Sequence, residues 1–88
     1  MYRWNEEKNE LLLSQRGVSF NDVLYELENN GVIDNYKHPN IEKYPNQYIY
    51  VISLKGYIHY VPYVKNDDYI FLKNIIPSRK LNKQYKGV

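Results

Sequence analysis

The sequence predicts a single α+β domain over residues 1–88, with two N-terminal helices packed on a twisted antiparallel sheet of three to four strands and a short C-terminal helix. Three observations lead to this prediction. Helix caps and helical spacing fill residues 1–31, strand-like alternation fills residues 48–76, and a basic helical segment follows Pro77. A chain of 88 residues has room for one core, so no second domain is expected.

The first helix is expected over residues 5–16. Asn5 is a suitable N-cap, two glutamates follow it where the helix dipole favours negative charge, and Gly17 is a typical stop. The apolar stripe of this helix is narrow, because it consists of Leu11, Leu12 and Leu13 alone. The helix should therefore lie on the surface, with Trp4 packed beneath its start.

The second helix has the clearest local signals. Ser19 and Asp22 have the spacing of a capping box, and Val18 with Val23 has the spacing of a hydrophobic staple. The helix should end at Asn29-Asn30-Gly31. One buried face follows from the helical spacing of Phe20, Val23, Leu24 and Leu27.

The remaining chain predicts a meander of strands. Residues 32–36 are expected to form a short edge strand, residues 37–47 a loop with two prolines, and residues 48–54 and 57–64 a hairpin around Lys55-Gly56. A turn at residues 65–68 leads into a third strong strand over residues 69–76, which ends where the basic helix begins.

The hairpin turn pairs Leu54 with Tyr57 and so sorts the side chains into two faces. One face carries most of the tyrosines and His59, and the other is drier, so the helices are expected against the drier face. The same register carried onward puts Ile70, Leu72 and Ile76 on the supposedly open face and Lys73 on the drier one. Either the register slips by one residue or Pro62 marks a bulge, and alternation does not decide between them.

Composition bounds the class of protein. The chain has no cysteine, which excludes disulfides and thiolate metal sites, and its apolar runs are strand-sized, so a soluble cytoplasmic protein with no membrane contact is expected. Residues 1–30 carry six acids against three bases, whereas the chain from Lys73 onward has five bases and no acid. This polarity predicts an anionic partner at the C-terminal end. Eleven tyrosines suit either a half-buried sheet or a binding face.

Seven segments of the chain share residues with one known protein family. They are Trp4-Asn5-Glu6-Glu7-Lys8-Asn9, Arg16-Gly17-Val18-Ser19-Phe20, His38-Pro39-Asn40, Lys43-Tyr44-Pro45-Asn46-Gln47, Val61-Pro62-Tyr63-Val64, Phe71-Leu72-Lys73 and Pro77-Ser78-Arg79-Lys80. In this order they resemble the BrnT family of toxins from type II toxin–antitoxin pairs. One departure is that the family often has Ser-Ala-Arg-Lys where this chain has Pro77-Ser78-Arg79-Lys80.

The resemblance implies a RelE-like fold and a metal-independent ribonuclease that arrests translation and growth, without a cofactor. It also implies neutralisation by a BrnA-like antitoxin, a ribbon-helix-helix protein through which alone the pair would bind operator DNA. RNA cleavage without a metal needs a base, an acid and cations around the phosphate. The candidate catalytic residues are Arg79, Lys80, His38, His59 and Tyr85, and the candidate RNA-binding residues are Lys73, Ser78, Lys83 and Tyr63.

Arg79 and Lys80 stand out because a helix start disfavours cations, so helix stability does not explain them, whereas a phosphate site at the free N–H groups does. Each candidate also has a structural alternative. In these alternatives, the basic helix is only a solvated surface and Tyr85 docks the last helix on the rest of the protein. His59 is then a structural residue of its strand, and His38 stabilises a turn. The two histidines lack metal-site spacing.

Two functions other than a ribonuclease remain open at this level. A non-catalytic module would hold nucleic acid by charge and tyrosine stacking. A protein-binding subunit would have its tyrosine face covered by another chain.

Overall fold

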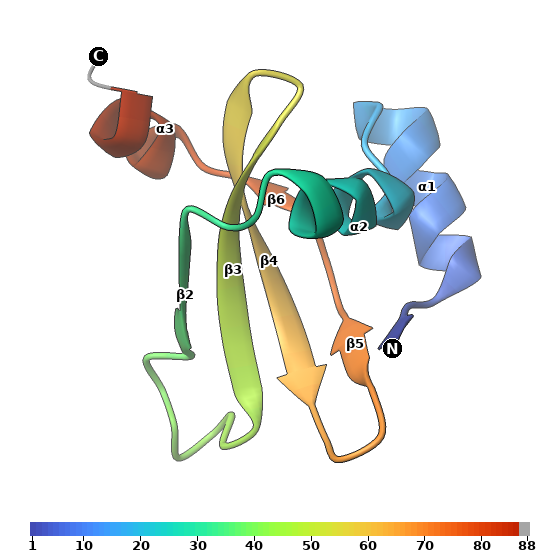
Figure 1. The fold of residues 1–88 in the computed structure, drawn as a ribbon, viewed down its shortest axis with the longest axis vertical. Helices are drawn as coiled ribbons and strands as arrows, with labels where there is room; N and C mark the ends of the chain where they lie inside the picture. The colour runs from blue at the N-terminus through green and yellow to red at the C-terminus, as the bar shows by residue number, and fades with distance from the viewer. Residues whose placement is uncertain (87–88) are drawn as a thin grey trace.

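The computed structural model describes residues 1–86 as three helices and a mixed sheet. The elements are β1 (Tyr2–Arg3), α1 (Glu6–Arg16), α2 (Phe20–Asn29), β2 (Asp34–Lys37), β3 (Gln47–Leu54), β4 (Tyr57–Lys65), β5 (Ile70–Leu72), β6 (Ile76–Pro77) and α3 (Arg79–Lys86). The strand order is β1-β5-β4-β3-β2, and β6 also pairs with β4. Figure 1 shows α1 and α2 on one side of the central strands and α3 on the other. The predicted α+β class is confirmed.

Within residues 1–86 the sheet has six strands and not three to four, because the strand expected over residues 69–76 is divided into β5 and β6 and a further strand is added at one edge. β1 pairs in parallel with β5, through Tyr2 opposite Ile70 and Arg3 opposite Phe71, so the sheet is mixed and not purely antiparallel. A strand of two residues has no period that sequence patterns can show. The expected edge strand at the other side is confirmed as β2, which lies antiparallel to β3.

The two N-terminal helices begin as the sequence predicts. The Asn5 side chain accepts a hydrogen bond from the Lys8 backbone N–H (2.9 Å), and Gly17 ends α1 with a left-handed φ of 69°. Ser19 and Asp22 form both bonds of a capping box at the start of α2. These caps satisfy backbone groups that the first and last turns leave without helical partners.

The buried side chain of Asn9 joins α1 to α2. Its Oδ1 accepts a hydrogen bond from the Phe20 backbone N–H (2.6 Å), and its Nδ2 donates to Glu6 Oε1 (3.0 Å) and Asn21 Oδ1 (3.1 Å). Trp4 stacks on Phe20, with ring centroids 5.8 Å apart. The helical pair is therefore held by one polar side chain and by an aromatic contact at the start of each helix.

The helices cover the face of the sheet that was expected to be open, so that prediction was wrong. The main core joins Leu12, Phe20 and Val23 of the helices to side chains of the tyrosine face, namely Tyr50, Ile52, Leu54, Val61, Tyr63, Leu72 and Ile75. The tyrosines fit there because they stack on one another: the rings of Tyr50 and Tyr63 lie 4.0 Å apart. Tyr63 also donates its hydroxyl proton to Asn35 Oδ1 (2.6 Å). A stacked and hydrogen-bonded phenol is compatible with burial.

A bulge reconciles the strand register with these faces. The hairpin pairs Leu54 with Tyr57 as predicted, and Tyr63 lies opposite Leu72. Further along β4, Tyr60 lies opposite Ile76 of β6. Three residues separate Leu72 from Ile76, whereas two separate Tyr63 from Tyr60. The extra residue lies in the connection between β5 and β6, opposite Pro62, which has no N–H to return a hydrogen bond to Lys73. The bulge therefore turns Ile76 to the other face.

That other face is covered in part by α3. Leu81 of α3 packs against a second small core of Ile49, Val51 and Ile58. The Asn82 side chain accepts a hydrogen bond from the Ile58 backbone N–H (3.1 Å), and the Ser78 backbone N–H donates to the Ile58 carbonyl (3.0 Å). Because α3 is short and contacts the end of this face near Ile58, the part around Pro62 stays uncovered by a helix.

Candidate functional site

A cavity of about 390 Å³ occupies the face of the sheet that carries α3. Three segments distant in the sequence form its wall: the loop between β2 and β3, the strands β3 and β4, and the bulge between β5 and β6. The residues that line it are His38, Tyr44, Gln47, Ile49, Tyr60, Pro62, Lys73, Asn74 and Ile76. Two residues nominated from the sequence, His38 and Lys73, therefore share one cavity although 35 positions separate them.

The loop after β2 holds His38 in one orientation. The backbone N–H of His38 donates to the Gln47 carbonyl (2.9 Å), and the imidazole packs against the Tyr44 ring with centroids 4.5 Å apart. The Asn40 backbone N–H donates to His38 Nδ1 (3.1 Å). Because Nδ1 accepts this bond, the neutral ring carries its proton on Nε2. His38 thus offers the cavity a hydrogen-bond donor.

The bulge places Lys73. Its backbone N–H donates to the Pro62 carbonyl (2.8 Å), and its exposed side chain borders the cavity. Lys73 also lines a second cavity of about 520 Å³ at the start of α1, together with Lys8 and Glu7. Alternation in the sequence did not decide which face of the sheet carries Lys73. The extra residue in the connection between β5 and β6 decides it, and the side chain borders both cavities.

The charges around the first cavity suit an anionic ligand. Its lining contains one lysine and one histidine, and no carboxylate among the residues that the structure describes. On the same face, Tyr36 lies opposite Ile49 in the β2–β3 ladder. Burial, and then the neighbouring Asp34 carboxylate, raise the pKa of Tyr36, so its phenol stays protonated at neutral pH.

The candidates on α3 lie outside the cavity lining. Arg79 and Lys80 are exposed in the first turn, as the sequence predicts, and Lys83 is exposed one turn later. The Ser78 hydroxyl accepts a hydrogen bond from the Leu81 backbone N–H (3.1 Å), which makes it a cap of α3.

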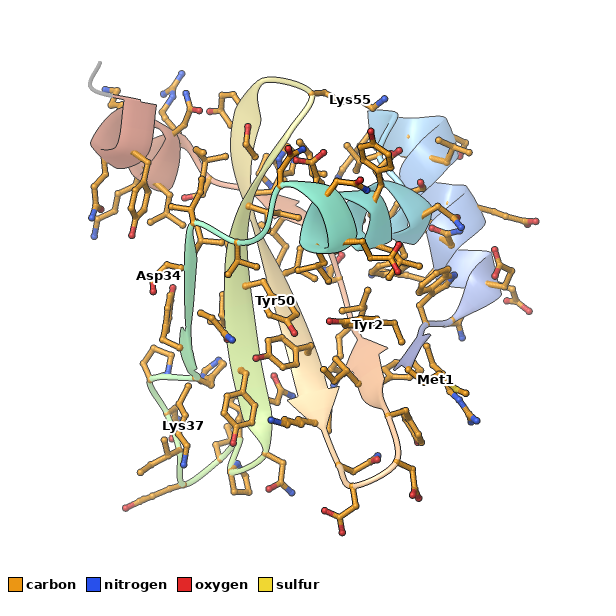
Figure 2. The ribbon with its side chains drawn as sticks, in the orientation of Figure 1. Met1, Tyr2, Asp34, Lys37, Tyr50 and Lys55 are labelled. Atoms are coloured by element: carbon orange, nitrogen blue, oxygen red, sulfur yellow. The ribbon has the colours of Figure 1, made fainter. Side chains whose placement is uncertain are left out.

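Tyr85 connects α3 to the edge strand. Its hydroxyl donates to Asp34 Oδ2 (3.3 Å), and Figure 2 shows Asp34 on β2 beneath the helix. This contact matches the alternative in which Tyr85 docks the last helix.

His59 and Tyr63 lie on the helix-covered face, apart from the other candidates. His59 is 6% exposed, and its Nδ1 lies 2.9 Å from the Tyr57 carbonyl. Burial lowers the pKa of His59. Tyr63 is 3% exposed and belongs to the main core. Neither side chain is placed to reach a ligand in the cavity.

Four polar residues of the cavity were not predicted from the sequence: Tyr44, Gln47, Tyr60 and Asn74. Tyr44 and Gln47 belong to a segment that carries the family resemblance, which was a usable signal. Tyr60 was assigned to the drier face, which was expected beneath the helices. Asn74 lies in the bulge, so its position depends on a backbone irregularity that no alternation pattern contains.

No group of three or more histidine, cysteine or acidic side chains within residues 1–86 is arranged to hold a metal ion. In the same range, no helix has both the length and the apolarity of a membrane span. Comparison of the chain with family models, with curated proteins and with solved structures finds no match.

Proposed function

We propose that this chain is the toxin of a type II toxin–antitoxin pair, a metal-independent ribonuclease with a RelE-like fold that arrests translation and growth. The cellular setting proposed is the cytoplasm, with a BrnA-like ribbon-helix-helix antitoxin as the neutralising partner. The observation that carries the proposal is the shared cavity of His38 and Lys73, which brings a hydrogen-bond donor and a cation to one anion-accepting surface.

The chemistry assigned to the cavity follows from these two groups. Metal-independent cleavage proceeds by attack of the 2′-oxygen on the adjacent phosphorus, with the 2′-hydroxyl proton passing to water, and by departure of the 5′-oxygen, which takes a proton from water. The Lys73 ammonium group supports the phosphate, where negative charge develops. His38 Nε2–H donates a hydrogen bond to a non-bridging oxygen of the phosphate, because its Nδ1 already accepts the Asn40 N–H. Its role is thus to bind the phosphate as a hydrogen-bond donor and not to act as a base.

A cleavage assay in excess chelator tests this assignment. Purified protein is expected to cut a labelled RNA in EDTA, and Lys73→Ala should lower the rate by about 100-fold or more, which is typical for loss of one group that stabilises developing charge. Lys65→Ala is the matched control, since Lys65 is also exposed, at the end of β4, but does not line the cavity. Equal rates for both variants, or no cleavage by the wild type, would contradict the proposal.

Arg79 and Lys80 are assigned to capture of the RNA strand, because both are exposed beside the cavity-bearing face without lining the cavity. The double variant Arg79→Ala with Lys80→Ala should abolish growth arrest on expression and leave the thermal unfolding midpoint unchanged. For a single strand, the slope of log affinity against log salt should fall by about 1.4 when two phosphate contacts are lost. An unchanged slope would remove these residues from the binding surface.

A second candidate is a non-catalytic module that binds nucleic acid. The feature that favours it is the Asn40–His38 hydrogen bond, because it occupies the nitrogen that would otherwise act as a base. Under this alternative, Lys73→Ala weakens RNA binding while the wild type leaves RNA intact. The chelator assay therefore separates the two functions, with RNA binding measured on the same samples.

A further inference from the structure

We infer that the cavity beside Lys73 holds one unstacked nucleobase, with the adjoining phosphate at the Lys73 side chain, so that the ligand is single-stranded nucleic acid and not a duplex. The inference deepens the proposed function, on which it rests for the identity of the strand as RNA. Three features of the cavity lead to it: its aromatic and apolar wall, its fixed hydrogen-bond donors, and its charge.

The wall suits the flat face of a base. Tyr60 is half-buried against Ile49, Val51 and Ile58, so its ring is held by the second core. On the side of the loop, the His38 and Tyr44 rings brace each other. Stacking on such aromatic side chains is how proteins hold bases of single strands, and it tolerates any base because every base has a π-face.

The polar groups suit the edge of a base. Asn74 Oδ1 accepts a hydrogen bond from the Ile75 backbone N–H (2.8 Å), which leaves the Asn74 amide N–H₂ as donors to a ligand. His38 Nε2–H is a second donor, and the Gln47 amide offers both a donor and an acceptor. In a duplex, the Watson–Crick edge that these groups would bind is already paired, and the base is stacked inside the helix.

Size and charge complete the match. A volume of about 390 Å³ lies in the range of small-ligand sites, so the cavity takes part of one strand and not a helix. Among the described residues that line it, Lys73 is cationic and none is acidic. A base with its phosphate fits this combination better than an uncharged or cationic ligand does.

The test measures binding without cleavage. The probe is a short 2′-deoxy oligonucleotide with one 2-aminopurine, which has no 2′-hydroxyl to react and whose fluorescence changes on stacking. The same oligonucleotide annealed to its complement and free adenosine monophosphate are the two further ligands. The single strand should bind about tenfold or more tightly than the duplex, as expected when binding needs an unpaired base and unpairing costs a few kcal/mol.

Substitutions at Tyr60 separate stacking from bulk. Tyr60→Leu should lower affinity for the single strand by about fivefold or more, the loss typical of one base–aromatic contact, whereas Tyr60→Phe should stay within about twofold. Tyr25→Leu is the matched control, because Tyr25 is 61% exposed on α2 and outside the cavity. If Tyr60→Leu fails to fold, Tyr44→Leu in the loop replaces it, with the same expected loss.

The outcomes distinguish this inference from the proposed function. Equal binding of duplex and single strand, no loss with the leucine variants, or binding of the mononucleotide alone would overturn the single-strand inference even if the wild type cleaves RNA. Conversely, Tyr60-dependent binding of the single strand by a protein that cleaves no RNA supports the inference and rejects the nuclease.

Discussion

The hydrogen bonds of Asn9 give a prediction about stability whose size follows from the structure. Asn9→Ala removes the acceptor for the Phe20 N–H, and Phe20 is completely buried, so this donor would be left without water or a partner. An unsatisfied buried N–H costs about 1–3 kcal/mol. The two bonds from Nδ2 add about 0.5 kcal/mol, because Glu6 and Asn21 are exposed and can bond to water instead.

Alanine also forms helices better than asparagine, which offsets about 0.5 kcal/mol of that loss. The expected decrease in the free energy of unfolding is therefore about 2 kcal/mol. For an 88-residue domain with a total stability of about 4–13 kcal/mol, this is a large fraction. The corresponding drop in the unfolding midpoint is roughly 8–16 °C.

Urea unfolding followed by circular dichroism measures this difference, provided that the slope of the transition is the same in both proteins. Asn21→Ala is the control, because it removes only the exposed acceptor of one Asn9 bond and should change stability by no more than about 0.5 kcal/mol. If Asn9→Ala and Asn21→Ala lose the same amount, the buried bond to Phe20 does not hold the helices together and the reasoning fails.

Two further predictions concern His59 and Gly17. Burial lowers the pKa of His59, so its imidazole binds a proton more readily in the unfolded chain than in the folded protein. The stability that neutral His59 contributes is therefore complete above about pH 6.5 and is lost as the pH falls below that value. His59→Gln should flatten the decline of unfolding free energy between about pH 7 and 5, and an unchanged pH profile would contradict this. Gly17→Ala should cost about 1–2 kcal/mol, since φ is 69° while no atom lies within 4 Å of the added Cβ, and Gly17→Asn should cost less in the same urea assay.

The candidate site shows which part of a function can be predicted from sequence. His38 and Lys73 could be nominated because each is a chemically capable residue in a recognisable segment. The cavity that they share could not be predicted, because it forms only when the β2–β3 loop, the sheet and the bulge are placed together. His59 was nominated on the same chemical grounds, yet it lies in the core, because residue type carries no information about which face a helix will cover.

The sequence by itself determined the features that depend on neighbouring residues. The caps at Asn5 and Ser19, the stop at Gly17 and the Leu54–Tyr57 turn each require only a few adjacent side chains and backbone groups, and all four are present in the structure. The helices α1 and α2 and the hairpin strands β3 and β4 follow from the same local rules, whereas the strand expected over residues 69–76 is divided into β5 and β6.

Only the tertiary structure decided which face of the sheet the helices cover. Alternation separates two faces but does not rank them when one is rich in tyrosine, because a tyrosine that stacks and donates its hydroxyl proton is as compatible with the core as an isoleucine. The bulge likewise depends on Pro62, which has no backbone N–H, lying opposite Lys73, a residue more than ten positions further along the chain. These long-range contacts turned Tyr60, Lys73 and Asn74 into the wall of one cavity.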